Sequence, residues 1–167
     1  VFVNKMDRVG ADFDAVVEDI RSKLGANAHP VLIPMGAEDE LKGQIDVINL
    51  KAVLYSDDDQ LGSTYEVTEL TDEQLELAQA ARKSLLEALA DVDDEIGLKF
   101  LDESEILPAD IKAGLRRATI ANVIVPVVGG SAFKNKGIQY LLDAVVDYLP
   151  SPLDIPAAQG RRVDDES

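Results

Sequence analysis

The chain has 167 residues, of which 46% are apolar and 29% are charged, a composition typical of one folded domain or slightly more and not of a disordered chain. Its 32 acidic and 16 basic residues give a net charge of −16, which argues against direct nucleic-acid binding because contacts from Lys and Arg to phosphates dominate that affinity. It has no cysteine and no apolar run near the roughly 20 residues that cross a bilayer, so we expect a cytoplasmic protein without disulfides and without a membrane segment.

The chain opens on an apolar strand at residues 1–3, and Asn4, Lys5, Met6 and Asp7 follow it directly. The carboxylate of Asp7 can accept two parallel hydrogen bonds, which suits the ring N–H and the exocyclic amine of guanine. The stem of Lys5 is long enough to lie over a flat base, and the amide of Asn4 can brace a neighbouring loop. This Asn-Lys-x-Asp box therefore predicts guanine recognition. Because the chain begins with Val inside a strand, we expect it to be part of a longer protein.

Apolar residues at helical spacing predict a helix over residues 12–24, which Gly25 ends. A β-rich region follows, because β-branched residues cluster between groups of Gly, Asp and Ser. The expected strands lie within residues 31–34, 45–55 and 64–70.

Thr71 and Gln74 form a capping box, which starts a second helix. We expect this helix to run to about residue 100, with a weak point at Gly97 because glycine destabilises a helix interior. Pro108 suits the first turn of a third helix.

Another apolar strand is predicted at residues 123–128, and Pro126 within it indicates a position near a sheet edge or near the end of the strand. A last helix is predicted over residues 137–149. The prolines and polar residues from 151 to 167 indicate a linker.

The strand at 123–128 runs into a Gly-Ser-Ala turn that contains Ser131 and Ala132. Small residues are needed where the backbone itself must approach a base, and an N–H of this turn can donate to the carbonyl oxygen of guanine. Alone, such a turn is a weak signal that also fits a simple strand-ending turn. Paired with the upstream strand and its Asn-Lys-x-Asp box, it predicts the second half of a guanine site.

Several runs of this sequence resemble the elongation factor G family, the translocation GTPases of the bacterial ribosome. The box continues as Asn-Lys-Met-Asp-Arg and is followed by Gly-Ala-Asp-Phe at 10–13. Further matching runs lie at residues 36–40, 130–137 and 147–152. The resemblance extends over roughly residues 1–156.

The resemblance implies an α/β fold, the C-terminal portion of a Ras-like P-loop GTPase sheet with an inserted α+β subdomain. It implies contacts with guanine from Asn4, Lys5, Asp7, Ser131 and Ala132, with Lys134 as a flanking candidate. The nucleotide would be GTP or GDP with Mg²⁺ in the full-length protein. We assign no catalytic residue and no metal ligand to this chain.

The spacing of the two motifs indicates the same organisation. More than 120 residues separate Asp7 from Ser131, whereas a βαβ unit takes about 30. The expected division is a GTP-binding part at residues 1–26 and 122–150, an inserted subdomain at 27–121 and a linker at 151–167. The resemblance identifies the insertion as the G-prime subdomain, which in that family meets the ribosomal stalk protein. The ribosome and its stalk protein are therefore the expected partners.

No Gly-x-x-x-x-Gly-Lys-Ser/Thr phosphate loop occurs in the 167 residues. Charge-assisted phosphate contacts are the strong ones in nucleotide binding, so we expect this chain alone to bind GTP negligibly and to be inactive. In the full-length protein we expect GTP hydrolysis on the ribosome, promoting movement of tRNA and mRNA. The alternatives are a specialised paralogue, of the release-factor-recycling or ribosome-protection type, and a chain that acts only as a module binding the stalk protein.

Three other features are expected to be structural. The Asp-Asp-Asp run at 57–59 suggests the start of a calcium loop, but Thr68 stands where a bidentate Glu is needed, so we expect an acidic turn. His29 has no neighbouring nucleophile and is expected to be structural. The acidic side chains within residues 91–95 are expected to form a solvated helix face.

Overall fold

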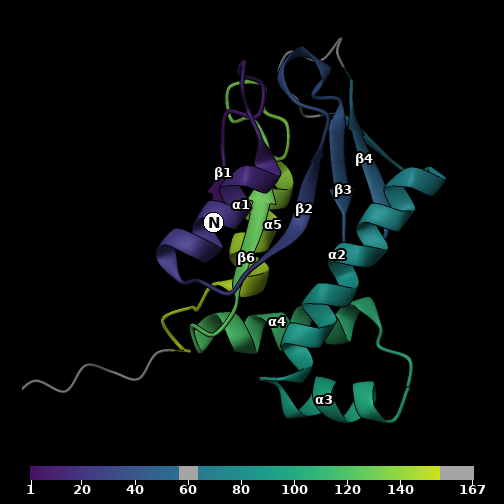
Figure 1. The fold of residues 1–167 in the computed structure, drawn as a ribbon, viewed down its shortest axis with the longest axis vertical. Helices are drawn as coiled ribbons and strands as arrows, with labels where there is room; N and C mark the ends of the chain where they lie inside the picture. Colours follow the sequence, from purple (N-terminus) through teal and green to yellow (C-terminus); the bar gives the residue numbers. More distant parts are fainter. Residues whose placement is uncertain (57–63, 155–167) are drawn as a thin grey trace, which may run out of the picture.

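The computed structural model describes residues 1–56 and 64–154. In these residues one mixed sheet of six strands, in the order β1-β6-β2-β3-β4-β5, is covered by helices (Figure 1). The strands are β1 (Phe2–Val3), β2 (Ala28–Met35), β3 (Gly43–Asp46), β4 (Lys51–Tyr55), β5 (Tyr65–Thr68) and β6 (Val125–Gly129). The helices are α1 (Phe13–Leu24), the short 3-10 helix η1 (Glu38–Glu40), α2 (Asp72–Ala90), α3 (Asp94–Leu101), α4 (Pro108–Ile120) and α5 (Ile138–Tyr148). The α/β class predicted from the sequence is confirmed.

Strand β6 lies between β1 and β2 and is parallel to both. Phe2 of β1 pairs with Val128, and Ala28 of β2 pairs with Val125. The two strands that precede the candidate motifs are therefore neighbours. Pro126 is the second residue of β6 and so lies near the N-terminal end of the strand, which is one of the two predicted positions. The other, at a sheet edge, does not hold, because β6 lies inside the sheet. From β2 onward, β3, β4 and β5 pair antiparallel, so the same sheet continues into the residues expected to be inserted.

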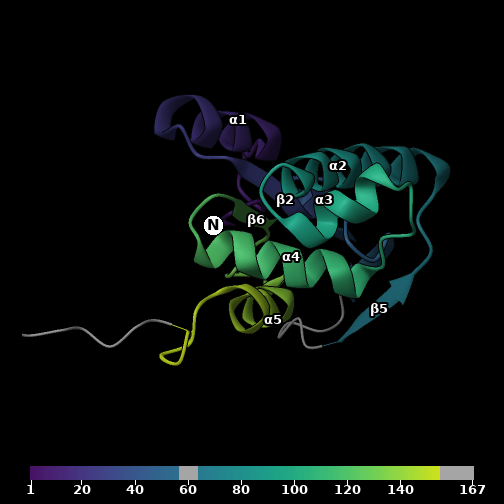
Figure 2. The ribbon, with the colours of Figure 1, turned by 90° about the horizontal axis from the view of Figure 1, so that it is seen from below.

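Successive residues of β6 face opposite sides of the sheet and enter two separate cores. Val127 packs in a core with Phe13 and Val17 of α1. Val128 packs in the other core, which includes Leu115 of α4 and Tyr148 of α5. Figure 2 shows α1 and α5 on opposite sides of β6. The loop after β1 and the loop after β6 are therefore anchored by helices on different faces of the sheet.

The helix that begins after Thr71 is interrupted, but not at Gly97 as predicted. Helix α2 ends at Ala90, and a new helix starts after Asp93, whose Oδ1 accepts a hydrogen bond from the N–H of Ile96 at 3.0 Å. Gly97 lies inside α3. A capping carboxylate defines a helix start, whereas a glycine inside a helix costs only about 1 kcal/mol relative to Ala and need not end it.

Asp93 also differs from its acidic neighbours, because it is 7% exposed while Asp91, Asp94 and Glu95 are exposed. Arg117 of α4 donates to both of its oxygens, from Nε at 2.6 Å and from Nη2 at 2.9 Å. This hydrogen-bonded guanidinium is the main cause that lowers the pKa of Asp93. The expectation of a solvated acidic face is therefore wrong for Asp93, which joins α3 to α4 instead.

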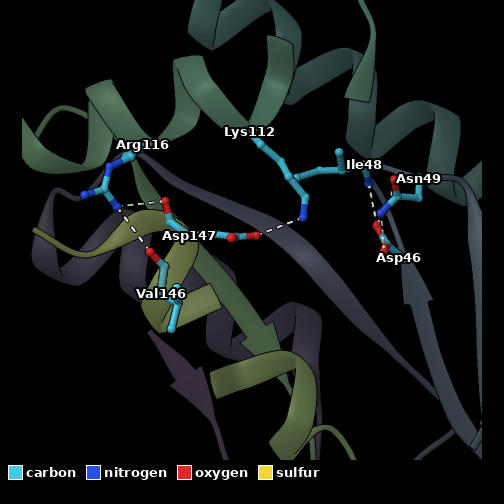
Figure 3. Close-up of polar contacts among 7 residues, drawn as sticks. All are labelled: Asp46, Ile48, Asn49, Lys112, Arg116, Val146 and Asp147. Carbon is cyan, nitrogen blue, oxygen red and sulfur yellow. Dashed lines mark hydrogen bonds and ion pairs between the residues drawn. The ribbon is translucent and has the colours of Figure 1, made fainter. Parts of the chain in front are cut away.

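Residues 45–55 hold two strands, because Asp46 turns the chain at the end of β3. Its Oδ1 accepts hydrogen bonds from the N–H groups of Ile48 at 3.0 Å and Asn49 at 2.9 Å, and its Oδ2 accepts one from the Asn49 amide at 2.7 Å (Figure 3). Aspartate commonly closes turns in this way. The chain then returns as β4.

Helix α4 holds the C-terminal end of α5 through two basic side chains (Figure 3). Lys112 Nζ lies 2.8 Å from Asp147 Oδ2. Arg116 Nη2 donates to Asp154 Oδ2 at 2.7 Å. Its Nη1 donates to the carbonyl oxygens of Val146, Asp147 and Leu149, at 3.2, 3.0 and 3.1 Å. These carbonyls belong to a helix end, where the helix itself supplies no partner.

The single histidine, His29, is buried in β2, with Nε2 2.9 Å from Asn27 Oδ1. Burial lowers the pKa of His29. The acidic run at 57–59 lies outside the described residues. Within residues 1–56 and 64–154, no helix combines the length and the apolar character that crossing a membrane requires.

Candidate functional site

The loops that follow β1 and β6 lie side by side at one end of the sheet (Figure 1). We call residues 4–10 the first loop and residues 130–136 the second loop. The N–H of Met6 donates to the carbonyl oxygen of Gly130 at 3.1 Å, and the N–H of Gly130 donates to that of Val3 at 3.0 Å. Because parallel strands place their carboxyl ends at the same edge, two motifs far apart in the sequence come into contact.

Asn4 joins the two loops through one oxygen atom. Its Oδ1 accepts hydrogen bonds from the N–H of Lys5 at 2.7 Å and from the N–H of Ala132 at 2.9 Å. Lys5 adopts a left-handed backbone with a φ of 66°, which is uncommon for a residue other than glycine. Asn4 therefore holds a strained turn of the first loop and braces the second loop at the same time.

The carboxylate of Asp7 contacts the second loop through the hydroxyl of Ser131. Ser131 Oγ donates to Asp7 Oδ1 at 2.6 Å and accepts the N–H of Lys134 at 3.2 Å. Ser131 is fully buried, and the side chain of Asp7 is 7% exposed. The bond from Ser131 is the main reason that the pKa of Asp7 lies below its ordinary value, and the charges of Arg8 and Lys134 act in the same direction against the effect of burial. Asp7 is therefore ionised at neutral pH, and its Oδ2, 3.9 Å from Arg8 Nε, can accept further hydrogen bonds.

The other candidate residues lie at the surface of the same two loops. Lys5, Ala132 and Lys134 are exposed. The structure thus gathers all six candidate residues in two adjoining loops, with Lys134 tied in by its backbone N–H. Together they offer an ionised acceptor, a backbone donor and two positive charges, which are the groups that can recognise a flat heterocycle carrying N–H donors and a carbonyl.

Two side chains without a predicted role, Glu38 and Gln44, contact the first loop and the last residue of β6, which leads into the second loop. Glu38 Oε1 accepts the N–H of Gly10 at 2.7 Å. Gln44 is fully buried and donates from Nε2 to the carbonyl oxygen of Gly129. Glu38 belongs to the run at 36–40 that resembles the elongation factor G family, but that run suggested no contact with the loops, and no sequence signal marked Gln44.

The comparisons with known proteins cover both loops. The sequence profile of the family described as "Elongation factor Tu GTP binding domain" matches residues 1–151. A crystal structure of a protein from Thermus thermophilus is similar, with a TM-score of 0.78 and 29% identical residues. The match covers 92% of this chain and 22% of the Thermus chain, so this chain spans about a fifth of the length of that protein.

Proposed function

Because the chain belongs to the family of elongation factor Tu GTP-binding domains, we propose that it is the guanine-recognition part of a longer translational GTPase. Its fold is that of a portion of a P-loop GTPase domain. The observation that carries the proposal is the hydrogen bond between Ser131 and Asp7, which joins an ionised carboxylate to a turn 124 positions further along the chain.

In this proposal, Asp7 reads guanine by accepting hydrogen bonds from the ring N–H and the exocyclic amine. The stem of Lys5 covers the flat face of the base, and Lys134 flanks the site with a second positive charge. The N–H of Ala132 serves the carbonyl oxygen of guanine. Since that N–H donates to Asn4 Oδ1 in this structure, base binding would move the hydrogen bond or make it three-centred.

The phosphates and Mg²⁺ are assigned to other parts of the full-length protein. The family binds guanine nucleotides, but this sequence has no phosphate loop, and among the described residues no group of three or more His, Asp or Glu side chains is placed to hold a metal ion. Because phosphate contacts supply much of the affinity, the chain alone should bind GTP negligibly and should not hydrolyse it. Isothermal titration calorimetry tests this, and submicromolar GTP binding would contradict it.

The longer protein is proposed to be a translocase of the elongation factor G type, which hydrolyses GTP on the ribosome in the cytoplasm and promotes movement of tRNA and mRNA. The runs that resemble this family, at 10–13, 36–40, 130–137 and 147–152, support the proposal. The alternative is a paralogue that recycles release factors or protects ribosomes. Ribosomes should stimulate GTP hydrolysis by the purified full-length protein in either case. Movement of a pre-translocation complex should occur only with a translocase.

Residues 27–121 are proposed to form the G-prime subdomain and to bind the ribosomal stalk protein. Helices α2 and α3 carry exposed acidic side chains, and Leu98 and Leu101 on α3 are 64% and 80% exposed. An acidic surface with apolar residues suits a basic partner with an apolar patch. An NMR titration with purified stalk protein should shift resonances within residues 71–121, and a spectrum unchanged there would count against the proposal. Stalk binding by a full-length protein that does not hydrolyse GTP would support the alternative of a binding module only.

The variant Asp7→Asn in the full-length protein tests guanine recognition directly. Asn keeps an oxygen that can accept from Ser131 but replaces the second acceptor with an NH₂ donor. The affinity for GDP should fall by about 100-fold, and the affinity for XDP should rise, because xanthine has a carbonyl where guanine has its amine. Asp14→Asn, at an exposed position of α1, is the matched control and should bind GDP like the wild type. Unchanged GDP binding by Asp7→Asn would refute the role of this carboxylate.

A further inference from the structure

Residues 36–44, from the end of β2 to the second residue of β3, contact the first loop, the last residue of β6 and the second loop. We call them the bracing segment. Besides the contacts of Glu38 and Gln44, the carbonyl oxygen of Leu41 accepts a hydrogen bond from Lys136 Nζ at 2.7 Å. The segment belongs to the part proposed to be inserted, so it joins that part to both halves of the guanine site.

The bracing segment holds the first loop through Glu38. Its N–H donates to the carbonyl oxygen of Met6 at 2.8 Å, and its Oε1 accepts the N–H of Gly10 at 2.7 Å. Since Met6 and Gly10 lie on either side of Asp7 in the sequence, these two bonds fix the loop that carries the carboxylate. The segment is tightly bent: Glu38 has a φ of 56°, and a Cβ added to Gly36 would lie 2.2 Å from a backbone oxygen. The bend sets the position from which Glu38 reaches the loop.

The bracing segment also holds the end of β6, from which the second loop starts, through Gln44. Its Nε2 donates to the carbonyl oxygen of Gly129, and its Oε1 accepts the hydroxyl of Tyr55 at 3.0 Å. A Cβ added to Gly137 would lie 2.0 Å from Nε2, and one added to Gly130 would lie 3.2 Å from it. A buried amide that is bonded at both ends and enclosed so closely has one orientation available. It therefore fixes the two ends of the turn that contains Ser131 and Ala132.

We propose that Glu38 and Gln44 are positioning residues for guanine recognition, a role that deepens the proposed function and rests on it. A base must meet Asp7 from the first loop and Ala132 from the second loop at the same time. The two groups therefore need a fixed separation, and a misplacement of about 1 Å costs much of such a site's function. Glu38 and Gln44 supply that separation from behind the loops, and their effect on binding passes through Asp7 and Ala132.

The test compares GDP with IDP, whose base lacks the exocyclic amine, in the full-length protein. The wild type should bind GDP more tightly than IDP, because Asp7 accepts a hydrogen bond from that amine. Glu38→Ala and Gln44→Met should each weaken GDP binding by about tenfold and reduce the preference for GDP over IDP. Glu38→Ala displaces Asp7 directly, and Gln44→Met displaces it through Ser131, whose hydroxyl donates to Asp7 Oδ1. A role in stability alone would lower the melting temperature and leave the preference unchanged.

Two further variants sharpen the comparison. Glu38→Gln keeps an oxygen that can accept the N–H of Gly10 and should retain the preference for GDP. Glu40→Ala lies in the same segment, removes an exposed pair with Lys42 at 3.0 Å, and should change neither affinity.

Each outcome decides a different point. A wild-type preference for GDP in both Glu38→Ala and Gln44→Met would overturn the inference and leave the proposed function standing. Should Gln44→Met fail to fold, Glu38→Ala decides, because Glu38 is exposed and its replacement opens no cavity. A wild-type protein that binds GDP and IDP equally would overturn the proposed function, and this inference with it.

Discussion

Replacing Ser131 with Ala should reveal how strongly the two loops are held together. The variant removes the hydroxyl that donates to Asp7 Oδ1 at 2.6 Å, and Ser131 is fully buried, so water has no access to take its place. The second bond of the hydroxyl, to the N–H of Lys134, is replaceable because that residue is exposed. Hydrogen bonds to charged groups contribute about 1.5–3 kcal/mol, so the free energy of unfolding at pH 7 should fall by about 2 kcal/mol.

The pH dependence of this loss identifies the charged partner. The pKa of Asp7 is lower in the folded chain than in the unfolded one, mainly because of Ser131. Such a group stabilises the fold at every pH above its pKa in the unfolded chain, which is about 3.9 for Asp. This contribution is lost as the pH falls through the pKa of the group in the folded chain. The difference between Ser131→Ala and the wild type should therefore be full at pH 7 and should shrink below about pH 4.

Urea unfolding followed by circular dichroism between pH 7 and pH 3 measures this difference. Ser22→Ala, at an exposed position of α1, is the matched control and should stay within about 0.5 kcal/mol of the wild type throughout. A deficit for Ser131→Ala that is the same at every pH, or no deficit at pH 7, would refute the reasoning.

Other positions give separate tests. Gly25→Ala should lower the free energy of unfolding in urea by about 1 kcal/mol, because Gly25 has a φ of 63° and nothing lies within 4 Å of an added Cβ. Gly137→Ala should lower it by about 3 kcal/mol, because Gly137 has a φ of 92° and an added Cβ would lie 2.0 Å from Gln44. Equal losses would contradict the enclosure of Gln44. Burial lowers the pKa of His29, so as the pH falls below about 6.5 the unfolded chain is protonated at this residue before the folded chain, and the free energy of unfolding decreases. His29→Leu should make this decrease with falling pH smaller. A decrease in the same assay that equals that of the wild type would exclude this cause. Arg116→Ala should speed amide hydrogen exchange in the last turn of α5 about tenfold and leave its first turn unchanged, and uniform exchange along the helix would argue against a local anchor.

Elements whose causes are local could be predicted from the sequence. Asp12 and Gly25 close the two ends of α1, and Pro108 opens α4, where the predictions placed them. The start of α3 could not be placed, because Asp93 is fixed there by Arg117, 24 positions away. Residue type alone does not distinguish such a carboxylate from its solvated neighbours.

The same difference divides the candidate site. Asn4, Asp7 and Ser131 could be identified because they are characteristic residues directly after apolar strands. Glu38 and Gln44 could not be identified, since their partners Gly10 and Gly129 lie 28 and 85 positions away. Nothing near Gln44 in the sequence marks it as a glutamine that donates to a strand so distant. Contacts of this kind exist only once the sheet has formed.

The contacts of Arg116 with the end of α5 couple the position of α4 to that of the chain that follows α5. Its planar guanidinium holds three carbonyl oxygens and the Asp154 carboxylate together, so the chain that leaves α5 cannot swing independently of α4. At its other end α5 begins beside Gln44. Both ends of α5 thus contact residues that lie between β2 and β6 in the sequence, Gln44 at its start and Arg116 at its end. A displacement of α4 would therefore be transmitted through Arg116 to residues 150–154.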